Sequence, residues 1–183
     1  MALADGGSTL LRIAILAGLF LALPLAPAAA GDARHADPAL EALLPTTLGG
    51  KALTLASQSG TELSTQSTAF DAFLAELGRS RGDFTLASAY SQGELRAEVG
   101  GWRVEGADPA RLLPAFRKAV QASSATPLTG ADEQLAGRTV TRIGDPGQLA
   151  RGPLYVLVRG DALLFVQTPD RALAEEALAK LPR

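Results

Sequence analysis

The sequence predicts an α+β domain in which a single antiparallel sheet of about six strands carries amphipathic helices on one face. Runs of alternating polar and apolar residues, separated by short turn-forming stretches, are typical of hairpins. Other runs place apolar residues three and four positions apart, which indicates helices. In addition, the stretch LGGKALTLA from Leu48 resembles LAGRTVTRI from Leu135, and each begins a half that closes with a hairpin and a helix. The domain is therefore compatible with two degenerate β(α)ββα halves.

Composition limits the function classes that the chain fits. The chain has 183 residues, of which 47% are hydrophobic, so it has material for one globular domain. A formal net charge of -2 leaves no basic excess to neutralise phosphates, which disfavours nucleic acid as a partner. The absence of cysteine excludes disulfides, thiolate nucleophiles and thiolate metal ligands. We expect no cofactor.

The N-terminus has the order of a secretory signal peptide. Arg12 precedes an apolar run over 13–26, and small residues follow at Ala28 and Ala30. This order predicts a signal peptide over residues 1–30, with cleavage near Ala30. The mature protein would then be secreted, or would lie in the periplasm or bacterial cell envelope.

The alternative is that the same segment stays uncleaved as an N-terminal membrane anchor. Residues 13–30 just reach the length needed to span a bilayer. Pro24 and Pro27 would break or kink a helix there, which favours cleavage. A membrane is a partner only if the segment is retained.

The remaining chain divides into an N-terminal segment and one α+β domain. Asp37 as N-cap and Pro38 at the first helical position predict a short helix. We expect the following organisation: N-terminal tail and short helix 31–47, then a single domain 48–183 with a first half 48–120, a linker 121–134 and a second half 135–183.

The first half is expected to begin with a strand that contains Leu53 and Leu55, followed by a polar surface loop over Ser57 to Ser67. A helix then runs from Thr68 to Gly78, with Thr68 and Asp71 resembling a capping box. Its apolar stripe comprises Phe70, Phe73, Leu74 and Leu77.

A hairpin follows, with Gln92-Gly93 as its turn, and the alternation of its second strand changes phase at Gly100-Gly101. Val99 belongs to one face, whereas Trp102 would belong to the other. A bulge at the glycine pair would turn both sets inward, and a second tight turn there is the competing interpretation.

The two later helices are expected to be introduced by Asp108-Pro109 and Thr168-Pro169, and Asp108 can accept a hydrogen bond from a first-turn N–H. Pro114 lies inside the first of them, where it removes the bond to the Ala110 carbonyl and predicts a kink or a short first turn. In the second half, Gly160-Asp161 is the predicted turn of a hairpin. The apolar side of the last helix comprises Leu173, Ala174, Ala177, Leu178 and Leu181.

No catalytic constellation is visible, so we expect a protein that is not an enzyme. The only histidine, His35, lies in the predicted tail without a partner to orient it. Glu94, Glu98 and Glu105 are interpreted as solvent-facing strand residues, because none has an apolar context that would raise its pKa. A hydrolase that works without histidine is an alternative that no motif supports.

Arg-Gly-Asp occurs twice, at Arg81 to Asp83 and at Arg159 to Asp161. In a secreted protein this tripeptide could suggest adhesion. Both copies fall where turns are predicted, and Gly-Asp is favoured in turns on conformational grounds, so a turn is the preferred interpretation.

The expected function is therefore an exported, non-catalytic binding or interaction domain, whose partner is an unknown protein or a small apolar ligand. Trp102 lies beside the glycine pair, and Trp102 and Phe116 are the candidate ligand-binding residues. The alternative is a carrier that holds a small apolar or lipid-like ligand between sheet and helices, for which a cavity near these two residues is the expected sign.

Overall fold

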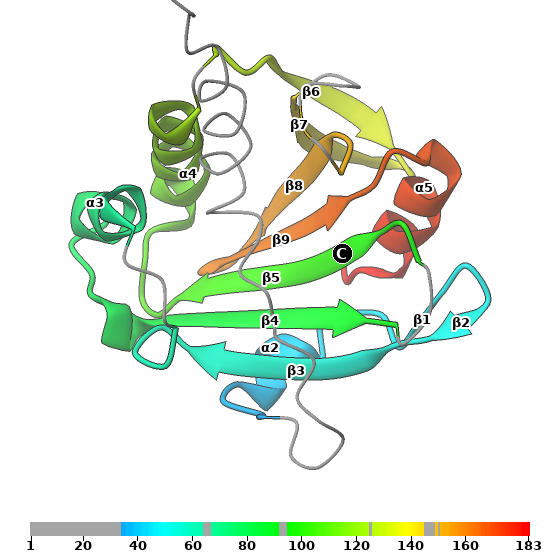
Figure 1. Ribbon diagram of the computed structural model, residues 1–183, viewed down its shortest axis with the longest axis horizontal. Coiled ribbons are helices and arrows are strands. Elements are labelled where there is room, and N and C mark those ends of the chain that lie inside the picture. The colour runs from blue at the N-terminus through cyan, green and yellow to red at the C-terminus, as the bar shows by residue number, and fades with distance from the viewer. Residues whose placement is uncertain (1–33, 64–66, 92–94, 125, 145–148, 150) are drawn as a thin grey trace, which may run out of the picture.

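The computed structural model describes residues 34–63, 67–91, 95–124, 126–144, 149 and 151–183. These residues form a main antiparallel sheet of seven strands, in the order β3-β4-β5-β9-β8-β7-β6, and a separate pair β1-β2 (Figure 1). The predicted α+β class with a large antiparallel sheet is confirmed. The strands are β1 Thr47–Leu48, β2 Lys51–Ala52, β3 Thr54–Ser59, β4 Phe84–Tyr90, β5 Glu98–Val104, β6 Gly130–Leu135, β7 Arg138–Ile143, β8 Leu154–Arg159 and β9 Ala162–Gln167. The helices are α2 Pro38–Glu41, α3 Thr68–Glu76, α4 Pro109–Ser123 and α5 Arg171–Lys180.

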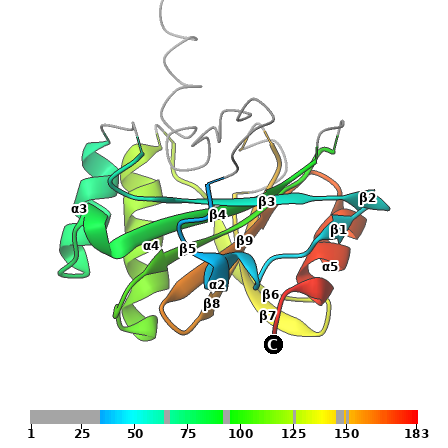
Figure 2. The same cartoon turned by 90° about the horizontal axis from the view of Figure 1, so that it is seen from below.

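Helices cover both faces of the sheet, whereas the sequence predicted helices on one face only. Strand β9 shows why, because all six of its residues are buried. Leu163 and Phe165 pack in the core beneath α3 and α4, and we call this side the α3–α4 face. Leu164 and Val166 pack with α2 and α5 on the α2–α5 face. Figures 1 and 2 show α3 and α4 side by side, with α5 at the far end of the sheet.

The glycine pair forms neither a bulge nor a tight turn. The β4–β5 ladder runs without interruption through it, pairing Ala87 with Gly101 and Ser88 with Gly100. Val99 therefore packs on the α2–α5 face and Trp102 on the α3–α4 face, as strict alternation requires. The change of phase in the sequence reflects a strand that is buried on both faces.

The expected linker 121–134 is wrong in its second part. Helix α4 continues to Ser123, and β6 begins at Gly130 as the edge strand of the sheet. Most of β6 is exposed and polar, so it has no alternation that would distinguish it from a loop. The predicted loop at Ser57 also begins too early, because β3 extends to Ser59.

Side-chain caps define the helix starts. Asp37 and Asp108 accept hydrogen bonds from the first-turn N–H groups of α2 and α4, as predicted. Ser67 caps α3 in place of the expected Thr68, and Asp170 caps α5 two residues after Thr168. Helix α4 starts at Pro109 and contains Pro114. The predicted kink or short first turn at Pro114 stays a prediction.

The internal similarity corresponds to two turns of the same type. The β1–β2 turn places Gly49 and Gly50 at φ of 57° and 71°, and the β6–β7 turn places Ala136 and Gly137 at 52° and 72°. Two positive φ values are the signature of a type I′ hairpin turn. Across the sheet, β7, β8 and β9 are adjacent in the same way as β3, β4 and β5, but in the opposite direction. The correspondence does not extend to the helices, because α4 and α5 pack on opposite faces.

Replacing Ala136 by glycine is expected to stabilise the protein by about 0.5–1 kcal/mol. A left-handed alanine costs about 1–2 kcal/mol, and the greater freedom of glycine in the unfolded chain offsets part of this gain. Urea unfolding of Ala136→Gly should show a higher midpoint at an unchanged m value. The matched control is Gly137→Ala, which has nothing within 4 Å of an added Cβ but a φ of 72°, and should lower the midpoint.

Three features of the sequence fall outside the described residues: the apolar segment 13–30 with its expected cleavage position at Ala30, the turn Gln92-Gly93, and Glu94. Within the described ranges, none of the helices combines the length and the apolar character that crossing a bilayer requires.

Candidate functional site

The two residues predicted to bind ligand, Trp102 and Phe116, meet in the hydrophobic core of the α3–α4 face. Trp102 is 4% exposed, and its ring lies 4.8 Å from that of Phe116 and 4.4 Å from that of Phe165, measured between centroids. Neither residue lines the pocket beside Glu98, the cavity between β7 and β8, or the cavity beside Arg103 and Asp161. Closely packed side chains around Trp102 and Phe116 count against a carrier that holds an apolar ligand in a cavity between these two residues.

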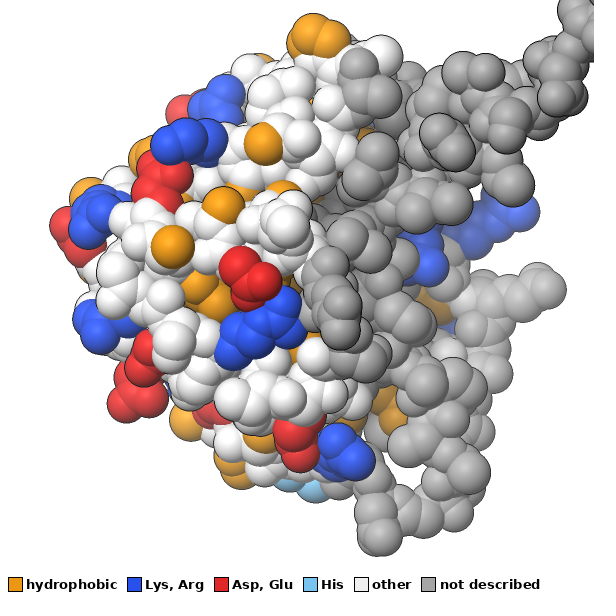
Figure 3. Space-filling view, turned by 60° about the vertical axis from the view of Figure 1, so that its left-hand side comes forward, with side chains coloured by type: hydrophobic (Ala, Val, Ile, Leu, Met, Phe, Trp, Pro, Cys, Tyr) orange, Lys and Arg blue, Asp and Glu red, His pale blue; other side chains and the backbone are white. Residues whose placement is uncertain are grey.

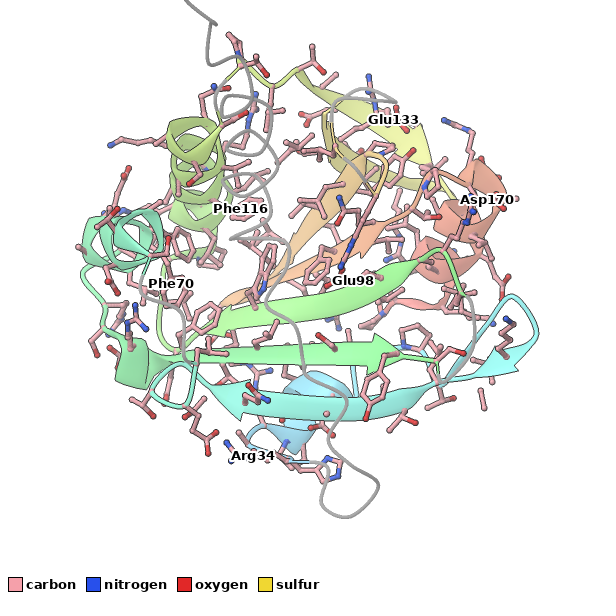
Figure 4. The ribbon with its side chains drawn as sticks, viewed as in Figure 1. Arg34, Phe70, Glu98, Phe116, Glu133 and Asp170 are labelled. Atoms are coloured by element: carbon pink, nitrogen blue, oxygen red, sulfur yellow. The ribbon has the colours of Figure 1, made fainter. Side chains whose placement is uncertain are left out.

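A pocket with a buried amide and an acidic side chain lies where β5 begins and β9 ends. It has a volume of about 350 Å³. Glu98 and Gln167 are direct cross-strand partners, so their side chains emerge side by side on the α3–α4 face. We call this cavity the Glu98 pocket, and its lining is Leu95, Arg96, Ala97, Glu98, Arg151, Gln167 and Pro169. Figure 4 shows Glu98 on β5 and Phe116 on α4.

Gln167 is a buried amide with an unused oxygen. The residue is 2% exposed, and its Nε2 donates to the Gly152 carbonyl at 3.1 Å. Its Oε1 accepts no hydrogen bond from any part of the chain that the structure describes. A buried acceptor without a donor costs about 1–3 kcal/mol, so a donor from a bound molecule would be stabilising here.

Glu98 is the acidic group of the pocket. Burial raises the pKa of its carboxyl group, and the nearby charge of Arg151 partly opposes that rise. Arg151 Nη1 donates to Glu98 Oε2 at 2.6 Å, with side-chain exposures of 60% for Arg151 and 24% for Glu98. The interpretation of Glu98 as a solvent-facing residue without apolar context is therefore wrong. Pairing with β9 and the packing of the segment before β5 bury it, and neither was visible in the local sequence.

The raised pKa of Glu98 predicts how its replacement changes stability with pH. Because the folded-state pKa lies above the unfolded one, the carboxyl group penalises the fold as pH rises through the interval between these two values. Glu98→Gln should thus be as stable as the parent or more stable by up to about 1 kcal/mol at pH 7. Below the ordinary glutamate pKa this difference should vanish.

Urea unfolding of both proteins between pH 3 and pH 8 measures the effect. Glu105→Gln is the control, because Glu105 is exposed at the end of β5. A Glu98→Gln protein that is markedly less stable than the parent at pH 7 would show that the pair with Arg151 outweighs burial.

His35 has a partner, so the expectation of an unsupported tail histidine is wrong. The segment before α2 forms a parallel bridge with β3 that pairs His35 with Ser57. His35 Nδ1 lies 2.7 Å from Glu41 Oε2, and Ser57 Oγ donates to Glu41 Oε1 at 2.6 Å. Ser57 is fully buried and is bonded to the carboxylate, not to the imidazole, so this arrangement is not a nucleophile and its base. The bridge and these side-chain contacts hold the segment before α2 against β3.

Both Arg-Gly-Asp copies occupy turns, as predicted. Arg81–Asp83 is a 3-10 helix, and Gly160-Asp161 connects β8 and β9. The Asp83 carboxylate accepts from the Ser80 N–H and Oγ, both at 2.8 Å, and these bonds lower its pKa. Asp161 lies 3.4 Å from Arg103 Nε. Each aspartate thus makes contacts within the fold.

The charge pattern supplies no further site on the side of α3 and α4. Figure 3 turns this side forward and shows acidic and basic side chains interspersed. No group of three or more histidine, cysteine or acidic side chains suited to a metal ion occurs among the described residues.

The Glu98 pocket could not be found from sequence, because it joins residues from β5, β9 and the segment before β8. A glutamate opposite a glutamine on paired strands leaves no motif in the local sequence. Comparison with known proteins adds no further candidate: no protein-family model matches this chain, and neither curated proteins nor solved structures gave a match.

Proposed function

We propose that this chain is an exported, non-catalytic binding domain whose ligand site is the Glu98 pocket. The observation that carries the proposal is the Gln167 Oε1 atom, which is buried without a donor beside a partly buried carboxyl group. Buried orphan acceptors are uncommon in folded proteins, and one that lines a cavity is a candidate ligand contact.

Binding accounts for the pocket better than catalysis does. Within the described chain, its lining contains one carboxyl group and no histidine, serine, threonine or tyrosine. A shifted carboxyl pKa is a feature of many active sites, but general acid–base work requires a second group to complete the proton transfer. Glu98 instead forms an ion pair with Arg151.

The polar groups define the ligand's chemistry. Glu98 and Gln167 offer oxygen acceptors, whereas Arg151 donates through Nη1 to Glu98 and is exposed enough to reach a second acceptor. A fitting ligand has an N–H or O–H donor next to an acceptor group. Amino acids are one class of small molecules with both, and the pocket volume of about 350 Å³ lies at the lower end of the small-molecule range.

The alternative function is a carrier of a small apolar or lipid-like ligand between sheet and helices. At Trp102 and Phe116 it is supported by their position on the α3–α4 face, but the Trp102 ring is tilted against Phe116 and stacked on Phe165, and these rings fill the space between them. A ligand-induced change in Trp102 fluorescence is the measurement that would favour it.

Titration calorimetry of the purified protein tests the proposal. The probes are the standard amino acids, matched simple amines and carboxylates, and small polyols. We expect binding by at least one donor-bearing probe, and a loss of tenfold or more in Gln167→Met and in Glu98→Gln, since each removes an acceptor worth about 1.4 kcal/mol.

Glu105→Gln removes an exposed carboxylate outside the pocket and should bind as the parent does. Circular dichroism would confirm that all variants fold. The proposal is contradicted if no donor-bearing probe binds at millimolar concentration, or if binding is unchanged in both pocket variants.

A further inference from the structure

The sheet opens between β7 and β8. These strands pair only from Thr141 opposite Val156 to Ile143 opposite Leu154, whereas β8 pairs with β9 along its full length. The first residues of β7 and the last residues of β8 therefore diverge. A cavity of about 520 Å³ occupies this divergence and is lined by both strands, and we call it the β7–β8 opening.

Three arginines gather at the side of the opening on the α2–α5 face. Alternation along the strands places Arg138 on the same face as Val140 of β7, and Arg159 on the same face as Tyr155 of β8. Arg183 follows the end of α5. Arg138 donates to the carbonyls of Leu181 at 3.0 Å and Pro182 at 3.2 Å, which holds the chain after α5 beside the opening.

These cations are not neutralised by the chain that surrounds them. Burial and the positive charges of Arg183 and Arg159 lower the pKa of Arg138. The side chains of Arg159 and Arg183 are exposed, and neither makes a hydrogen bond or an ion pair with the side chain of another described residue. Asp132 is the acidic side chain in the lining, and its Oδ1 is already bonded to Thr141 Oγ1 at 2.5 Å. Like charges held together in this way favour an anion between them.

The other side of the opening is apolar. Leu113 reaches it from α4 and Val158 reaches it from β8, both partly exposed on the α3–α4 face, and Val156 is buried beneath them. Since one cavity connects these side chains with the arginines, its two ends suit the two parts of an amphiphilic molecule.

We propose that the β7–β8 opening binds a single-chain anionic amphiphile, with its carboxylate or phosphate head at Arg138, Arg159 and Arg183 and its apolar chain against Leu113 and Val158. This site is separate from the Glu98 pocket in its residues and in its ligand chemistry, so it stands or fails independently of the function proposed above.

Titration calorimetry with four probes tests the proposal: dodecanoate and dodecyl phosphate below their micellar concentrations, inorganic phosphate, and dodecanol below its solubility limit. We expect at least one of the two amphiphilic anions to bind tenfold or more tightly than both inorganic phosphate and dodecanol. Comparing dodecanoate with dodecyl phosphate shows which head the arginines prefer.

Variants assign the two ends. Arg159→Gln combined with Arg183→Gln should weaken the amphiphilic anions at least tenfold and leave dodecanol unchanged. Leu113→Gln, which makes the apolar end polar without adding charge, should weaken them similarly and leave inorganic phosphate unchanged. Arg117→Gln, an exposed arginine on α4, is the matched control for lost charge. Glu98→Gln and Gln167→Met should bind the amphiphiles as the parent does, which separates this site from the Glu98 pocket.

Several results would overturn the proposal. Phosphate that binds as tightly as both amphiphilic anions would indicate a simple anion site, and dodecanol that does so would indicate an apolar cavity without a head site. Absence of amphiphile binding at millimolar concentration, or affinities unchanged in the double arginine variant, would remove it altogether.

Discussion

Gly100→Ala is expected to destabilise the protein by about 2–3 kcal/mol, a large effect for a single added methyl group. A Cβ at this position would lie 2.5 Å from Phe165 Cζ and 2.7 Å from the Ala87 carbonyl oxygen. The Phe165 ring cannot retreat freely, because it stacks on Trp102 with centroids 4.4 Å apart. The Ala87 carbonyl belongs to the β4–β5 ladder and is equally restrained. Urea unfolding with the m value monitored measures the loss.

Gly82→Ala is the matched control. The nearest atom to its added Cβ is Ser80 Oγ at 3.6 Å, and its φ is not in the left-handed region, so the change should stay within about 0.5 kcal/mol. Gly101→Ala should be intermediate, because its Cβ would meet the ends of two flexible leucine side chains. Equal stabilities for Gly100→Ala and the parent would mean that the aromatic stack repacks without cost.

The glycine pair also shows what the local sequence of a strand does not determine. Strict alternation places Val99 and Trp102 on opposite faces of the strand. A bulge or a turn is needed only if a single face of the strand is buried. The same assumption placed all helices on one face. Both expectations fail for one reason: α2 and α5 cover the second face, and local patterns do not show which face a helix packs against.

Elements with strong local signals were predicted well. The stripe of Phe70, Phe73 and Leu74 gave α3, and Gly160-Asp161 gave the β8–β9 turn. Strand β6 was missed because an exposed polar edge strand is held by backbone bonds to β7 and has no apolar pattern of its own.

The candidate sites depend on contacts between distant segments and could not be predicted. Glu98 becomes buried only when β5 pairs with β9, which brings Gln167 beside it. The β7–β8 opening depends on where a ladder stops, and nothing in the sequence of either strand marks that position. In both cases the polar residues are of common surface types, and tertiary placement alone gives them their chemistry.

Phe116→Ala is expected to destabilise the protein by about 3–5 kcal/mol, the range for removing a fully buried aromatic side chain. Phe116 is 0% exposed, and its ring centroid lies 4.8 Å from that of Trp102 and 6.4 Å from that of Phe73. The truncation would leave a cavity between α3, α4 and the sheet that the closely packed neighbours fill only in part. Thermal and urea unfolding, with Trp102 fluorescence as the probe, report the loss.

The size of this effect decides between the two roles that the sequence left open for Phe116. Phe116→Leu, which nearly conserves volume, should cost only about 1 kcal/mol and serves as the folded reference. In a packed core, Phe116→Ala is costly, and Phe116→Leu binds ligands of the Glu98 pocket as the parent does. A loss below about 1 kcal/mol for Phe116→Ala would instead indicate an open space beside Trp102, because only a side chain that borders a cavity can be truncated at so small a cost. That result would restore the apolar-ligand carrier as the better account of these two aromatic residues.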